Sequence, residues 1–88
     1  MPRLRKVHSA FMSTDLDGEL IMIDGKTGAF FALKGVGLAI WRKLDDEPEL
    51  DRICASLQAT YDVEPAVCRD DVQTFAEHLV TTGFAEYF

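Results

Sequence analysis

The segment from Asp17 to Leu44 is compatible with few folds. It reads DGELIMIDGKTGAFFALKGVGLAIWRKL: two short apolar runs separated by turn residues, followed directly by an amphipathic run that contains the only tryptophan. Its opening Asp-Gly pair predicts a tight hairpin between strands at Phe11–Leu16 and Glu19–Asp24. A second glycine-containing turn then predicts a third strand, at Ala29–Leu33. We therefore expect three antiparallel strands that lead almost without a linker into a helix.

The strands of this sheet carry apolar residues on both faces, whereas one helical layer can cover only one face. Alternation places Leu20 and Met22 on the face opposite Ile21 and Ile23. We expect an apolar outer face around Leu20, Met22 and Phe30. This face is either covered by the N-terminal residues or free to contact a partner enzyme or a second copy in a homodimer.

After the strands, apolar residues recur every three to four positions and predict three helices. Pro48 and Pro65 are placed to open the second and third helices, and Gly83 is placed to end the third. Strands followed by helices make an α+β fold, and the element content resembles a winged helix-turn-helix. The apolar stripes are Gly37, Ile40, Trp41 and Leu44; Leu50, Ile53, Cys54, Leu57 and Tyr61; and Cys68, Val72, Phe75, Ala76 and Leu79.

The chain of 88 residues suffices for one domain, with residues 1–10 as a flexible arm and residues 11–88 as the folded part. The formal charge of −6 opposes attraction to nucleic-acid phosphates, although a local basic patch can override net charge. A DNA-binding winged-helix regulator is the alternative function, but the second helix offers little beyond Arg52 and Gln58 to a recognition surface. No apolar run is long enough for a membrane span and no signal peptide is evident, so we expect a cytoplasmic protein.

No arrangement of residues in the sequence indicates catalysis or a cofactor. The serines have no His-Asp constellation near them, and there is no glycine-rich phosphate loop or set of metal ligands. Cys54 and Cys68 lie on the apolar stripes of separate helices and are expected to be buried thiols. A disulfide between them requires that the helices bring them close. We therefore expect a non-enzymatic protein without metal or cofactor.

An ordered set of residues extends over most of the chain: Asp17-Gly18-Glu19, Asp24, Thr27-Gly28, Phe30, Leu33, Val36-Gly37, Ile40-Trp41, Leu44, Ile53, Leu57, Tyr61, Val63, Asp71-Val72, Phe75, Leu79 and Gly83-Phe84. With the flanking residues, from about residue 11 to 84, this set resembles the PqqD-like proteins. These are stand-alone recognition elements for ribosomally synthesised and post-translationally modified peptides (RiPPs). The sequence departs from the family at Lys34-Gly35, where an asparagine usually opens the first helix, so a weaker helix N-cap is expected there.

The resemblance implies a winged helix-turn-helix of three strands and three helices, and a role without catalysis. A protein of this kind holds the leader segment of a precursor peptide and presents the rest to a modifying enzyme. That enzyme is a leader peptidase and cyclase in lasso-peptide systems, which we favour, or a radical SAM enzyme in pyrroloquinoline quinone synthesis. In such families the leader lies as an added strand against the third strand, in a groove bordered by the third helix.

The residues themselves suit this binding mode. A free strand edge offers unpaired N–H and C=O groups, and residues 29–33 include no proline or charge that would block pairing. On the third helix, Asp71 is placed to meet a cation of the leader and Phe75 to floor an apolar pocket. The opposite flank of that helix is an alternative wall, with Arg69, Gln73 and Val80. The expected peptide-binding residues are Ala29, Phe30, Phe31, Ala32, Leu33, Val67, Asp71, Phe75 and His78.

Overall fold

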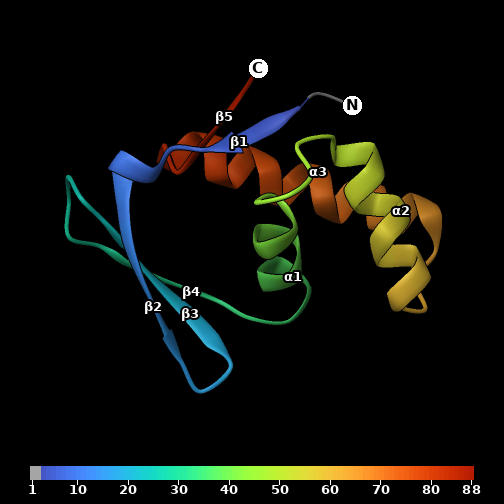
Figure 1. Ribbon diagram of the computed structural model, residues 1–88, viewed down its shortest axis with the longest axis horizontal. Helices are drawn as coiled ribbons and strands as arrows, with labels where there is room; N and C mark the ends of the chain where they lie inside the picture. Colours follow the sequence, from blue (N-terminus) through green and yellow to red (C-terminus); the bar gives the residue numbers. More distant parts are fainter. Residues whose placement is uncertain (1–2) are drawn as a thin grey trace.

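The computed structural model describes residues 3–88 and shows three strands that lead into three helices, with a further short strand near each end (Figure 1). The expected α+β class and the order of its main elements are confirmed, and the third strand of the sheet begins one residue later than expected. The elements are β1 (Leu4–Lys6), a 3-10 turn (His8–Ala10), β2 (Phe11–Leu16), β3 (Glu19–Asp24), β4 (Phe30–Leu33), α1 (Gly35–Lys43), α2 (Leu50–Thr60), α3 (Pro65–Thr82) and β5 (Ala85–Tyr87).

The antiparallel sheet has β3 at its centre, between β2 and β4. Asp17 and Gly18 form the turn between β2 and β3, and both have positive φ angles, as a tight two-residue hairpin requires. This turn fixes the register of the hairpin. Leu20 and Met22 consequently point toward the helices, where both are buried. The expectation that they lie on the outer face is therefore wrong.

The outer face of the sheet carries the alternate residues instead. Met12, Ile23 and Phe30 lie opposite one another across the three strands, and Met12 and Phe30 are 71% and 73% exposed. Alternation in the sequence separates two apolar sets on β3, but it cannot show which set the helices will cover. Of the three residues expected on this face, only Phe30 is found there.

The ends of the described chain pair with each other as β1 and β5, away from the main sheet (Figure 1). Leu4 is fully buried, and its N–H donates to the carbonyl of Pro48 at 2.8 Å. Residues 1–10 were expected to form a flexible arm, but from Arg3 onward this segment is packed on the domain. Because the segment at Pro48 contacts β1, α2 begins only at Leu50, and the expectation that Pro48 opens this helix is wrong.

α1 and α3 lie against the inner face of the sheet, α2 packs on α3, and the three helices supply most of the core. As expected, Pro65 is the first residue of α3, and Gly83 ends it in the left-handed conformation with a φ of 84°. Leu20 and Met22 meet the helices in this core, whose other members include Ile40, Trp41, Leu44, Leu50, Ile53, Leu57, Val72, Ala76, Leu79 and Phe84. No helix within residues 3–88 is long and apolar enough to cross a membrane.

A line of aromatic rings ties β4 to this core. The Phe31 ring meets the Phe84 ring edge-on, with centroids 5.3 Å apart. Phe84 in turn contacts Phe11 at 5.5 Å, and Phe11 contacts Trp41 at 5.2 Å. The edge-to-face contacts, Phe31–Phe84 and Phe11–Trp41, each add about 1 kcal/mol to simple burial. Together the rings connect β4 with the segment after α3, with β2 and with α1.

Candidate functional site

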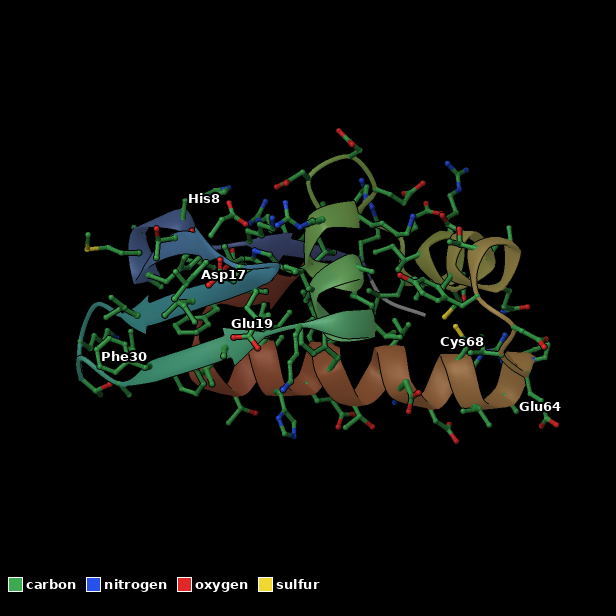
Figure 2. The ribbon with its side chains drawn as sticks, turned by 90° about the horizontal axis from the view of Figure 1, so that it is seen from below. His8, Asp17, Glu19, Phe30, Glu64 and Cys68 are labelled. Carbon is green, nitrogen blue, oxygen red and sulfur yellow. The ribbon has the colours of Figure 1, made fainter. Side chains whose placement is uncertain are left out.

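An apolar hollow of about 120 Å³ lies between β4 and α3. Figure 2 shows the strand that begins at Phe30 running along α3, which passes beneath it in that view. Phe31 and Leu33 enter the hollow from β4, and their neighbour on the outer face, Phe30, points away from it. The remaining lining residues are Met22, Phe75, His78, Leu79, Thr82 and Phe84. The hollow can therefore take an apolar side chain that lies against β4.

A second, larger hollow of about 370 Å³ continues from the first, because Phe75 and His78 line both. It lies between α1 and α3, and its other lining residues are Val36, Gly37, Ile40, Asp71 and Thr74. Asp71 is its only carboxylate, at the end distant from the first hollow. A cationic group on an apolar stem fits such a site, since the stem can cover apolar surface while the charge reaches the carboxylate.

Gly37 lies where α1 comes close to the Phe75 ring. A β-carbon placed on Gly37 would lie 3.4 Å from the Cε1 atom of Phe75. Gly35, two residues earlier, has a φ of 59° and begins the helix without a side-chain cap from Lys34, as the departure at Lys34-Gly35 predicted. The positive φ therefore favours glycine at position 35, whereas position 37 has room for a β-carbon.

The outer edge of β4 presents free backbone groups beside both hollows. The N–H of Asp24 donates to the carbonyl of Ala29 at 2.9 Å. Hydrogen-bonded pairs alternate along an antiparallel ladder, so Phe31 and Leu33 direct their N–H and C=O groups toward β3. Phe30 and Ala32 consequently direct theirs toward the free edge. An extended peptide can pair with this edge while its alternate side chains enter the hollows.

The structure brings together five of the nine residues expected to bind a peptide: Phe31, Leu33, Asp71, Phe75 and His78. Phe30 and Ala32 contribute backbone groups at the edge, whereas Ala29 precedes β4. Val67 is exposed but lines neither hollow.

The alternative wall of α3 does not face β4. Arg69 lies against α2, Gln73 bonds with Glu77, and Val80 packs on the core. Sequence reasoning missed the contribution of α1 to the second hollow, although it placed Gly37 and Ile40 on the apolar stripe of this helix.

The surface of α2 offers little to a nucleic acid. Its one arginine, Arg52, forms ion pairs with Glu47 at 3.6 Å and with Glu49 at 3.2 Å. Among residues 3–88, no group of three or more His, Cys, Asp or Glu side chains is arranged to hold a metal ion. A peptide is the ligand for which the geometry of β4 and α3 is suited.

Fold and groove together define a small winged-helix domain with an open strand edge beside a helix. Residues 19–85 match the family model of coenzyme PQQ synthesis protein D (PqqD). This match covers most of the chain, so the protein belongs to the PqqD family, and the resemblance seen in its sequence is confirmed.

Two solved structures are similar to this chain over nearly its whole length. TbiB1 in complex with the TbiA(beta) leader peptide is 26% identical, with a TM-score of 0.82 over 93% of this chain and 94% of that one. A lasso peptide synthetase B1 complexed with the leader peptide has a TM-score of 0.84, over 96% of this chain and 98% of that one. It is 20% identical to this chain, so the likeness shows the fold alone. The comparison with curated proteins gives no match.

Proposed function

We propose that this protein binds the leader segment of a ribosomally made precursor peptide and delivers it to a separate modifying enzyme. The leader adds as a strand to the free edge of β4, beside α3. The observation that carries this proposal is the coincidence of free backbone groups at Phe30 and Ala32 with two adjoining hollows on the same side. The similar structure that is 26% identical to this chain is a leader-peptide complex, which supports the proposal.

Leader recognition in this mode divides into two contributions. Backbone pairing with β4 gives affinity for any extended peptide, and the hollows select among side chains. Successive side chains of a strand alternate in direction, so two leader residues separated by one position enter the two hollows. The apolar hollow takes an aliphatic or aromatic side chain. The second takes a lysine or arginine whose charge meets Asp71.

The protein acts without catalysis of its own in this proposal, and the chemistry belongs to its partner. Of the two pathways that the family resemblance implies, we favour the lasso type, with a leader peptidase and a cyclase. A radical SAM enzyme of pyrroloquinoline quinone synthesis is the other candidate, in keeping with the family. Either role places the protein in the cytoplasm, where precursor peptides are made.

Fluorescence anisotropy with a labelled leader tests the proposal. The probe is the leader encoded by the short open reading frame nearest the gene, and the controls are a scrambled leader and one truncated from its N-terminus. We expect saturable binding with a Kd in the micromolar range or tighter, about −8 kcal/mol, that is lost on truncation. If folded protein binds neither this leader nor any other precursor leader encoded beside it, leader recognition is excluded.

A further inference from the structure

The two cysteines face each other in the contact between α2 and α3. The Cys54 thiol lies 3.9 Å from the backbone carbonyl oxygen of Cys68, and the Cys68 thiol lies 3.8 Å from that of Cys54. Both side chains are buried, at 5% and 4% exposure. Figure 2 shows the Cys68 side chain pointing from α3 toward α2. Each thiol thus already lies next to the backbone of the other cysteine and donates to its carbonyl oxygen.

Cys54 is the member of this pair that a small reagent can reach. It lines a surface hollow of about 410 Å³ between α2 and the start of α3, together with Gln58, Pro65 and Arg69. Cys68 does not line that hollow but lines a smaller space of about 20 Å³ beside Leu57. A small oxidant therefore meets the Cys54 sulfur first, with the Cys68 thiol directly behind it.

We propose that Cys54 and Cys68 form a modification site at which a two-electron oxidant of the peroxide class converts the two thiols into an intrachain disulfide. The Cys54 sulfur attacks one peroxide oxygen, the O–O bond breaks, and water leaves. The sulfur of Cys68 then displaces hydroxide from the oxidised Cys54, forming the S–S bond. The balance is two thiols and one hydrogen peroxide giving one disulfide and two waters. This inference does not depend on leader binding.

Burial and the neighbouring charges determine the pKa of the Cys54 thiol, and this pKa determines the rate of the first step. Burial, followed by the neighbouring Cys68 thiol and the Asp51 carboxylate, raises the pKa of the Cys54 thiol from 9.0 to about 11, while Arg69 opposes this. The thiolate is the reacting form, so the pair reacts slowly near neutral pH and faster as the pH rises. Oxidation is therefore best followed at about pH 9, where the thiolate is about 100-fold more abundant than at pH 7.

The disulfide would close the loop that joins α2 to α3. Closing a loop of this length restricts the unfolded chain and so raises the equilibrium constant for folding about 100-fold. By linkage, the folded chain favours formation of the disulfide by the same factor, relative to the unfolded chain. The bond would fasten the first turns of α3, which carry Asp71, to α2. It would thus fix one wall of the groove covalently.

The purified full chain is exposed to hydrogen peroxide at about pH 9, and thiols are then blocked under denaturing conditions before mass spectrometry. We expect a monomer lighter by two hydrogen atoms, with no free thiol, and a melting temperature more than about 10 °C above that of the reduced protein. Cys54→Ser and Cys68→Ser variants must give neither change. Persistent thiols, a disulfide-linked dimer, or Cys54 alone gaining oxygen would each overturn the proposal.

A second measurement shows whether the folded structure favours the disulfide over what two thiols in an unfolded chain would form. The disulfide is equilibrated in buffers of oxidised and reduced glutathione, once with native protein and once in concentrated guanidinium chloride. We expect that half of the disulfide is reduced in the native chain only at a reduced-to-oxidised glutathione ratio about 100-fold higher than in the unfolded chain. Equal ratios, or a native chain that disfavours the bond, would show that the geometry between α2 and α3 does not support it.

Discussion

Replacing Ala32 by proline tests strand addition by removing one backbone N–H donor from the free edge of β4. The N–H of Ala32 points to the free edge of β4, while Phe31 and Leu33 supply the bonds to β3. Proline is tolerated on an edge strand where its missing N–H faces outward. The substitution therefore removes a donor for the leader and leaves the ladder of the protein intact.

The expected loss of leader affinity follows from the leader carbonyl that is left without a donor. A leader carbonyl that pairs with Ala32 would stay buried and unsatisfied in the variant, which costs about 1–3 kcal/mol. At about 1.4 kcal/mol per tenfold change, leader affinity falls by a factor of about 5 to 150. The free energy of unfolding should change by less than about 1 kcal/mol, since no hydrogen bond within the sheet is lost.

Two variants serve as controls in the same anisotropy titration. Ala32→Val changes the exposed side chain but keeps the N–H, so it should bind the leader nearly as the parent protein does. Ser13→Pro places proline at an equivalent outward position on the other edge strand, β2, and should also leave binding unchanged. If Ala32→Pro is stably folded and binds with parental affinity, the leader does not add to β4. Loss of binding in Ser13→Pro alone would assign the leader to β2.

Other changes test the second hollow, the helix start and the buried thiol. Asp71→Lys should weaken the binding of a basic leader about 3- to 30-fold, measured by anisotropy, without shifting the melting temperature. Glu77→Lys, on the exposed surface of α3, should leave leader binding unchanged. Gly35→Ala should lower the free energy of unfolding by about 1–2 kcal/mol in a urea titration, because φ is 59° there, whereas Gly37→Ala should not. Under reducing conditions, stability should be constant below about pH 8 and fall by about 2 kcal/mol between pH 9 and 11. The Cys54 thiol ionises near 9.0 when unfolded and near 11 when folded, so unfolding releases its proton in that window, and Cys54→Ala should remove this loss.

Local sequence signals were sufficient to define most of the fold. The Asp17-Gly18 pair has one favoured conformation, so it determined both the hairpin and its register. Pro65 and Gly83 marked the two ends of α3 because each suits a backbone geometry found at only one end of a helix. These elements were predictable because each signal acts within a few residues.

What the sequence did not reveal depends on contacts between distant residues. The face of β3 that is buried is determined by where the helices pack, and Leu20 and Ile21 are equally apolar in the sequence. Pro48 has the chemistry of a helix start, but Leu4 bonds with its carbonyl and α2 begins later. In the groove, Asp71 and Phe75 were predictable from helix period, whereas the part of α1 at Gly37 was not, because its role arises only when the helices pack together.

The pairing of β1 with β5 also governs when this domain can finish folding. Arg5 and Glu86 lie 81 positions apart in the chain, yet their side chains are joined at 2.8 Å. Closing so long a loop carries a large entropic cost and tends to occur late. During synthesis, Leu4 leaves the ribosome early but has no β5 beside it until Ala85–Tyr87 have emerged. The hairpin and helices can assemble before that moment, so β1 is among the last elements to be secured although it is made before them.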